Sequence, residues 1–374
     1  MIPQELIDSI IHEVNHTPSL KACSLVCSNF RRPSQQILLR SLTLDDYTPP
    51  NYGEASTLLT ESPHVAGYIK NFGVRLTWVA VSAPSDADDF LRLLAKLTNV
   101  DQFSITADCR WEALFPVTPS VLDYIRRRKL RELHFSLVEN IPASVIALSL
   151  AHASALSFST ITVKTASDQL GQLPKAGPTV TALSLFECDG VDNLLGREDL
   201  SPYTANLRTL SIRPQSGSNC NTICSAASTL ENILFDLASL IRSPPYRLPY
   251  LPSLRSIHFR LPSKDYYEAP FTAMLTSFVP SIPPTLSVIS VTDSGILSAE
   301  RWLPSTFTTL DILLSDCATV PSLRWRVSFS RNEVGQSSFR SFEAIVQQGM
   351  PGMLEKGKLI VEWPDNMHKW PPRL

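Results

Sequence analysis

Apolar residues near the start of the chain recur with the period of an α-helix. The residues that share one helical face are Leu6, Ile7, Ile10, Ile11 and Val14. Gln4, Glu5 and Asp8 interrupt them, so the segment lacks the unbroken apolar run of a secretion signal. The pattern predicts an amphipathic helix that is kept in the folded protein.

Two more helices and a strand are predicted before residue 45. An N-cap followed by proline at residues 17–18 begins the second helix, and Pro33 near its first turn marks the third. Residues 41–44 then alternate with the two-residue period of a strand. Three helices this short cannot bury all of their apolar surface among themselves. Part of that surface is expected to face a neighbour or a partner.

A short apolar motif recurs through the rest of the chain. Its pattern, apolar-x-x-apolar-x-apolar, occurs at residues 100–105, 130–135, 153–158, 180–185, 207–212, 230–235, 254–259, 286–291 and 307–312. The central residues of the last eight motifs are 21 to 32 residues apart. Segments with a helical pattern lie between motifs at residues 89–97, 120–128, 191–199 and 271–279. The pattern predicts one strand followed by one helix in each repeat.

The spacing is similar to that of leucine-rich repeats, which are roughly 20 to 29 residues long. Cys188 occupies the position where that consensus has asparagine or cysteine, but most other repeats lack such a residue. We therefore expect the α/β fold class, with residues 45–374 forming an irregular leucine-rich-repeat-like solenoid that has a curved parallel sheet.

Both ends of this solenoid are expected to differ from its middle. Residues 45–95 are poorly patterned, with predicted loops at 45–56 and 82–89. Residues from about 335 to 374 predict a helix, a strand and a tail that cap the last repeat.

Partner recognition is expected on the outward face of the strands or on the adjoining loops. The residues between motif positions include Arg208, Thr209, Ser211, Arg255, Ser256 and His258. Ser211 and His258 are predicted to point outward and Leu210 and Ile257 inward, because side chains alternate along a strand.

Composition restricts the class of protein. The chain has 374 residues, of which 44% are hydrophobic and 18% charged, as in globular proteins. The net charge of −2 gives no general attraction to nucleic acid, and no run of about 18 apolar residues predicts a membrane span. Seven cysteines without a secretion signal indicate reduced thiols and a cytoplasmic or nuclear location.

Motifs for catalysis are missing from the sequence. It contains no G-x-S-x-G, no glycine-rich phosphate loop and no H-E-x-x-H. Cys23/Cys27 and Cys220/Cys224 have the spacing of thiolates on one helix face that could bind a metal. Each pair lacks further ligands, so buried thiols are the default interpretation. We expect no enzymatic activity, no metal and no cofactor.

Three other features each allow two interpretations. The basic residues 126–131 fit a phosphate site or a solvated helix end. The acidic residues 86–89 fit a helix N-terminus or a cation site. Trp363 and Trp370 fit a ligand-stacking site or the packing of a terminal strand.

The first 44 residues resemble the F-box. "IPQELIDSIIHEV" is similar to its opening, in which proline and glutamate precede an apolar helical repeat. "LKACSLVCSNFRRPSQQILLRSLTL" is similar to the remainder, especially in the form common in mushroom-type (basidiomycete) fungi. Two residues depart from the pattern: Ile2 replaces the usual leucine, and Phe30 stands where many members carry tryptophan. Residues 1–44 are therefore expected to form an F-box-like helical module.

F-box families use this module to dock on the Skp adaptor of cullin-RING ubiquitin ligases. The resemblance implies the partner-binding residues Pro3, Leu6, Ile7, Ile10, Leu25, Val26 and Phe30. It also implies a substrate-recognition adaptor that presents an unidentified protein on its repeats and reaches the cullin through Skp. Neither nucleic acid nor a membrane is expected as a partner. The alternative is a non-catalytic repeat scaffold without a ligase link, whose N-terminal helices only cap the repeats.

Overall fold

The structure is a computed structural model that describes residues 2–44, 52–76, 84–164, 180–213, 221–237, 248–261, 268–293, 304–317, 321–327 and 333–363. Cys220 and Trp370 lie outside the described residues. The chain divides into two compact units, Met1–Ala176 and Gly177–Leu374. The predicted module of residues 1–44 lies within the first unit.

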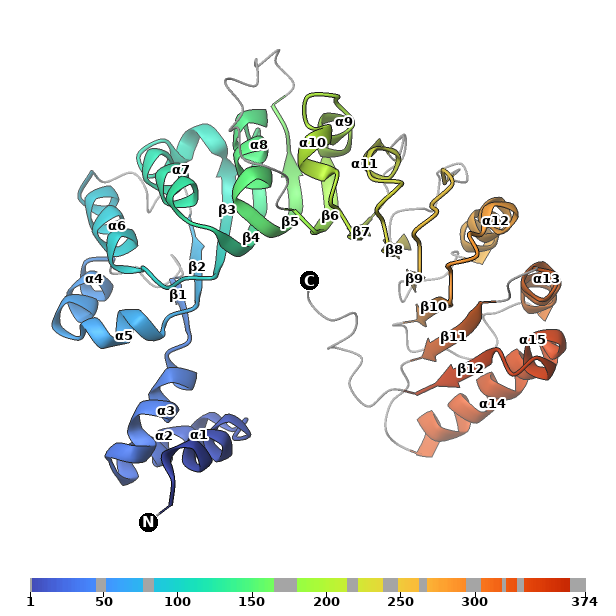
Figure 1. Ribbon diagram of the computed structural model, residues 1–374, viewed down its shortest axis with the longest axis horizontal. Coiled ribbons are helices and arrows are strands. Elements are labelled where there is room, and N and C mark those ends of the chain that lie inside the picture. The colour runs from blue at the N-terminus through green and yellow to red at the C-terminus, as the bar shows by residue number, and fades with distance from the viewer. Residues whose placement is uncertain are drawn as a thin grey trace. The chain divides into compact units, whose positions relative to one another are not determined.

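The first unit begins with three short helices and continues with strands and helices in alternation (Figure 1). Its elements are α1 (Gln4–His12), α2 (Thr17–Val26), α3 (Ser28–Leu38), β1 (Ser41–Leu44), α4 (Tyr52–Glu61), α5 (Pro63–Tyr68), β2 (Asn71–Arg75), α6 (Pro84–Lys96), β3 (Gln102–Arg110), η1 (Trp111–Leu114), α7 (Thr118–Arg127), β4 (Leu130–Glu139), α8 (Ala143–His152) and β5 (Ala153–Thr162).

The second unit also alternates strands with helices or turns. Its elements are β6 (Ala182–Asp189), α9 (Val191–Leu195), α10 (Ser201–Thr204), β7 (Thr209–Ile212), α11 (Asn221–Ser225), β8 (Asn232–Asp236), β9 (Ser256–Leu261), α12 (Glu268–Phe278), η3 (Val279–Ser281), β10 (Val288–Asp293), α13 (Pro304–Ser315), β11 (Ser322–Val327), α14 (Glu333–Gly349), α15 (Pro351–Glu355) and β12 (Leu359–Glu362).

Within each unit every strand pairs in parallel with the next strand in the sequence. The helices that connect the strands lie on one side of them (Figure 1). Parallel neighbours need a crossover connection, which the helices and turns provide. The fold is thus α/β with parallel strands, compatible with a solenoid of repeats, as the motif predicted.

The motif residues form continuous rows across neighbouring strands. In the first unit Leu133 lies opposite Leu156, and Phe135 opposite Phe158, with their rings stacked 5.9 Å apart. In the second unit one buried row runs through Leu183, Leu210, Ile233, Ile257, Ile289 and Leu323. Each repeat therefore completes the core of its neighbours, because a single repeat cannot close its own.

The prediction that the motif at residues 307–312 forms a strand is wrong. These residues lie in helix α13, where Phe307, Leu310 and Leu314 are fully buried at a helical spacing. Apolar residues three apart occur in the motif and on a helix face alike, so the pattern could not separate them. The strand of this repeat is β11, in which buried Leu323, Trp325 and Val327 alternate with less buried residues.

The first part of the repeat region is more regular than predicted. Helix α4 begins at Tyr52, inside the predicted loop 45–56, and α6 begins at Pro84, inside the predicted loop 82–89. Buried Tyr52 and Phe90 pack edge to face with their ring centroids 5.3 Å apart. The two helices thus share a core contact that their polar residues had obscured.

The predicted C-terminal helix and strand are present as α14, α15 and β12. The ring of Trp363 lies 5.6 Å from that of Phe339 on α14, which favours the packing interpretation of this tryptophan. No helix among the described residues is long and apolar enough to cross a membrane.

Candidate functional site

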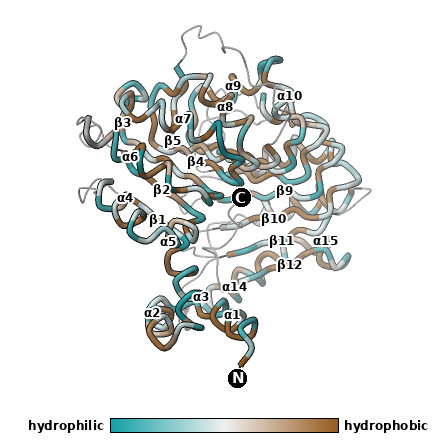
Figure 2. The backbone as a smooth tube through the Cα atoms, turned by 60° about the vertical axis from the view of Figure 1, so that its left-hand side comes forward, coloured by the Kyte–Doolittle hydropathy of each residue, from teal (hydrophilic) through white to brown (hydrophobic). Residues whose placement is uncertain are grey.

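Five large apolar side chains on α1, on α2 and just before α1 are exposed to solvent. They are Ile2, Leu6, Ile10, Leu25 and Val26, with exposed fractions between 53% and 81%. We call them the N-terminal apolar surface. Hydrophobic stretches are visible on α1 and α2 in Figure 2. A group of this kind marks an interaction site more often than a single exposed leucine does.

The periodicity of α1 explains why this surface is separate from the core. Leu6 and Ile10 are spaced by four residues on α1 and share one face, and Ile2 lies just before the helix. Ile7 and Ile11 lie on the neighbouring face and are buried with Leu20 of α2. The module therefore closes a small core of its own and still presents an apolar stripe.

Pro33 leaves a backbone carbonyl of α3 free to accept a hydrogen bond from the start of α1. It lies inside α3, not near the first turn as predicted, and it has no N–H to donate to the carbonyl of Asn29. The side-chain amide of Gln4 donates to that carbonyl instead, at 3.0 Å. This bond ties the start of α1 to the α2–α3 junction, next to Leu25 and Val26.

The structure separates the seven predicted partner-binding residues into two groups. Pro3, Leu6, Ile10, Leu25 and Val26 are exposed. Ile7 is only 4% exposed and belongs to the core, so its assignment to the partner-contacting surface is corrected. Phe30 is half-buried and packs against the same core. Ile2, which was noted only as a departure from the F-box pattern, is also exposed, just before α1.

The module joins the rest of the first unit through a face other than the N-terminal apolar surface. Helix α3 packs against α5, and the Arg40 carbonyl accepts the backbone N–H groups of Lys70 at 2.8 Å and Asn71 at 3.0 Å. Strand β1 then pairs with β2. None of these contacts uses the N-terminal apolar surface.

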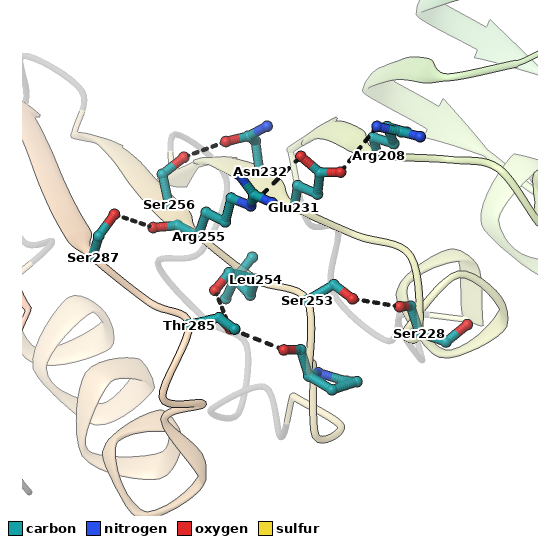
Figure 3. Close-up of polar contacts among 11 residues, drawn as sticks. Arg208, Ser228, Glu231, Asn232, Ser253, Leu254, Arg255, Ser256, Thr285 and Ser287 are labelled. Atoms are coloured by element: carbon teal, nitrogen blue, oxygen red, sulfur yellow. Dashed lines mark hydrogen bonds and ion pairs between the residues drawn. The ribbon is translucent and has the colours of Figure 1, made fainter. Parts of the chain in front are cut away.

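The outward faces of the strands form the second candidate surface. At the start of β7, β8 and β9, Glu231 lies between two exposed arginines, 3.2 Å from Arg208 and 3.9 Å from Arg255 (Figure 3). Ser256 donates to the side chain of Asn232 at 2.7 Å. The exposure predicted for Arg208 and Arg255 is confirmed.

The exposure predicted for Ser211 and His258 is wrong. They are only 5% and 7% exposed. Ser211 lies between Ser184 and Leu234 of the neighbouring strands, and both of these residues are buried too. His258 lies next to Leu234 in its row. Leu210 and Ile257 are buried, in agreement with the prediction.

Further along the strands the outward face is charged. Arg213 donates to Asp236 at 2.9 Å and to Glu187, and Arg326 donates to Glu362 at 2.7 Å. Burial, together with the positive charges of Arg326 and Arg260, lowers the pKa of His258 to about 3. The imidazole is therefore neutral at physiological pH. The sequence analysis did not identify these charged residues as part of the outward face. The alternation of Arg260 with the buried residues of β9, and of Arg324 and Arg326 with those of β11, was a signal that could have found them.

The remaining candidates are accounted for by local structure. Arg127 pairs with Asp123 at 2.9 Å, and Arg128 donates to the Thr98 carbonyl at 2.6 Å, which favours the helix-end interpretation of the basic cluster. Asp89 pairs with Arg92 at 2.8 Å within α6. Cys23 and Cys27 are free thiols, and in the part of the chain that the structure describes no three His, Cys, Asp or Glu side chains gather to hold a metal ion.

Comparison with known proteins adds no relative. No protein-family model matches the chain, and no curated protein matches it. Function therefore has to be inferred from the two surfaces themselves.

Proposed function

We propose that residues 1–44 form an F-box-like module that docks the chain on a Skp-type adaptor of a cullin-RING ubiquitin ligase. The strand–helix repeats, which we assign to an irregular leucine-rich-repeat class, would hold the protein to be modified. The observation that carries this proposal is the N-terminal apolar surface, whose five side chains are each more than half exposed.

The exposure of this surface favours docking over a capping role. If the helices only capped the repeats, their surplus apolar residues would be expected to pack against α4, α5 or β2. Instead Leu6, Ile10, Leu25 and Val26 face solvent, while α3 and Arg40 make the connection. Apolar side chains spaced by four residues on a helix are typical of helix-in-groove recognition.

An adaptor of this kind needs no catalytic residue. Holding a substrate next to a ligase raises its effective concentration, and the acceleration comes from proximity. The outward strand faces offer rows of polar and charged side chains for such a substrate, spaced about 4.8 Å apart from strand to strand. This division of labour assigns adaptor binding to the three helices and substrate binding to the repeats.

The first prediction concerns Leu6 and Ile10. The double variant Leu6→Asp/Ile10→Asp should lose binding to a purified basidiomycete Skp adaptor, by about 100-fold or more, because each change places an unpaired charge in an apolar contact. Both side chains are about half exposed, so the variant should fold with a circular dichroism spectrum and melting temperature like those of the natural sequence. Binding is measured by pull-down and by surface plasmon resonance.

The matched control is Leu58→Asp/Leu91→Asp. Leu58 on α4 and Leu91 on α6 are exposed to a similar degree, 55% and 48%, but lie outside the module. This control should bind the adaptor like the natural sequence. Retained binding by Leu6→Asp/Ile10→Asp would refute the docking role, and failure of the natural sequence to bind any Skp adaptor would favour the scaffold alternative.

A further inference from the structure

Polar side chains from neighbouring strands meet on the outward face of the second unit. Asp236, Arg260, Thr292, Arg326 and Glu362 stand opposite one another on β8 to β12. Two residues earlier on each strand, His258, Ser290 and Arg324 form the adjoining row. Thr292 therefore lies between Arg260 on β9 and Arg326 on β11. Arg324 is also on β11, in the adjoining row.

Thr292 and Arg324 each have a buried polar side-chain atom that lacks a hydrogen-bond partner among the described residues. These atoms are the Thr292 hydroxyl and the Nε of Arg324. Thr292 is only 3% exposed. A buried polar group without a partner costs roughly 1 to 3 kcal/mol, and more if it is charged. Unpaired donors of this kind are usually satisfied by a water molecule or by a ligand.

The electrostatic environment of these atoms is positive. Arg260 and Arg326 flank Thr292 in its row, and Arg324 lies in the adjoining row. The two carboxylates of the row, Asp236 and Glu362, are each two strands from Thr292 and accept hydrogen bonds from Arg213 and Arg326. Burial is the main cause of the lowered pKa of His258, and the positive charges of Arg326 and Arg260 lower it further. Each of the three arginines is half-buried, so part of each side chain reaches solvent.

We propose that Arg260, Thr292, Arg324 and Arg326 bind one anionic group, a carboxylate or a phosphate, on an acidic segment of the protein that the repeats hold. Guanidinium groups present forked N–H donors that match both kinds of oxygen anion, and the threonine hydroxyl supplies a further donor. The inference rests on the proposed function, because it identifies the chemistry of the substrate.

A protein segment fits this surface better than a nucleic acid. Glu187, Asp236 and Glu362 are interspersed with the arginines and would repel a continuous phosphate backbone. A single acidic side chain can reach the arginines while its neighbours contact the polar residues nearer the start of the strands. The chain's net charge of −2 agrees with this choice.

The test uses inorganic phosphate and acetate as probes on the full chain. Thermal unfolding is followed as either anion replaces chloride at constant ionic strength. We expect at least one of them to raise the melting temperature of the natural sequence with a saturable concentration dependence. Stronger stabilisation by phosphate would indicate a phosphorylated segment, and stronger stabilisation by acetate an Asp- or Glu-containing one.

Two variants and a control locate the site. Thr292→Val removes a buried hydroxyl that has no partner, so it should fold at least as well as the natural sequence and bind the anion about tenfold or more weakly. Arg324→Gln should weaken binding similarly. The control Arg208→Gln changes an exposed arginine near the start of the strands and should leave anion binding intact.

The outcomes separate this inference from the docking proposal. Leu6→Asp/Ile10→Asp should retain anion binding, because the N-terminal apolar surface is not part of the cluster. If the Skp adaptor binds but neither anion stabilises the chain, or if Thr292→Val and Arg324→Gln respond to the anions like the natural sequence, the anion site is refuted and the docking role stands.

Discussion

At the scale of single residues, neighbours in the sequence have opposite roles. Leu6 and Ile10 are about half exposed, whereas Ile7 between them is 4% exposed. All three are apolar and contribute alike to the helical pattern, so the pattern alone could not distinguish partner contact from core. Only the packing of α1 against α2 and α3 decides which face is left open.

A prediction at this scale concerns the buried imidazole of His258. Its pKa is about 3 in the folded protein, below the ordinary value of 6.5, so the unfolded chain binds more protons between these values. The stabilising contribution of the neutral imidazole to the free energy of unfolding should therefore be fully present above about pH 6.5 and be lost as the pH is lowered. Between pH 7 and pH 5 this residue should account for about 2 kcal/mol of the loss.

Urea unfolding at pH 7 and pH 5 measures this contribution. His258→Gln has no titrating group at the position, so its stability should fall by about 2 kcal/mol less than that of the natural sequence over the same interval. Burial also lowers the pKa of His134, but that effect is shared by both proteins and cancels. An equal loss in the two proteins would show that His258 is not held neutral by its surroundings.

At the scale of elements, carboxylates connect helices that are separated by another helix in the chain. Asp192 on α9 accepts the backbone N–H of Thr222 at 3.0 Å, at the start of α11. Asp311 on α13 accepts the N–H groups of Gly352 at 2.9 Å and Met353 at 2.8 Å, in the first turn of α15. Each carboxylate thus satisfies helix N–H groups that have no partner inside their own helix.

Asp311 provides a test of this connection. Asp311→Ala leaves the Gly352 and Met353 donors unsatisfied in a buried region and should lower the free energy of unfolding by roughly 1 to 3 kcal/mol. The control Asp316→Ala removes an exposed carboxylate at the end of α13 and should change stability by less than about 0.5 kcal/mol. Equal effects of the two changes in urea unfolding would mean that Asp311 does not anchor α15.

The strands of the fold were largely predictable, whereas several helices were not. Parallel strands repeat the same apolar spacing, so motifs such as those of β4 and β9 stand out even in a single sequence. Helix α4 was missed because its buried face, Tyr52, Ser56 and Leu59, contains a serine and a tyrosine. Helix α13 was mistaken for a strand because three-residue apolar spacing fits both periods.

The candidate sites were less predictable than the fold. The helical pattern placed Leu6, Ile7 and Ile10 on one apolar face, but the exposure of Leu6 and Ile10 and the burial of Ile7 needed the folded module. The cluster around Thr292 and Arg324 is assembled from strands more than 30 residues apart in the sequence. Only the register of the sheet brings these residues together.

At the scale of the whole molecule, the proposed function assigns two separate tasks to two surfaces. The N-terminal apolar surface lies on α1, on α2 and just before α1, and the proposed anion-binding cluster lies on strands of the second unit. Changes in one surface should leave the other functional, as the anion test with Leu6→Asp/Ile10→Asp examines. Such independence is what an adaptor between a ligase and its substrate requires.

Isothermal titration of the purified full chain with a purified Skp adaptor tests the central claim most directly. We expect a one-to-one complex whose binding heat capacity change is negative, because apolar side chains leave water. Leu6→Asp/Ile10→Asp should give no measurable binding, while Leu58→Asp/Leu91→Asp should bind like the natural sequence. If the natural sequence gives no binding heat at several temperatures and no complex on gel filtration, or if the Leu6/Ile10 variant binds equally well, the proposed docking function is contradicted.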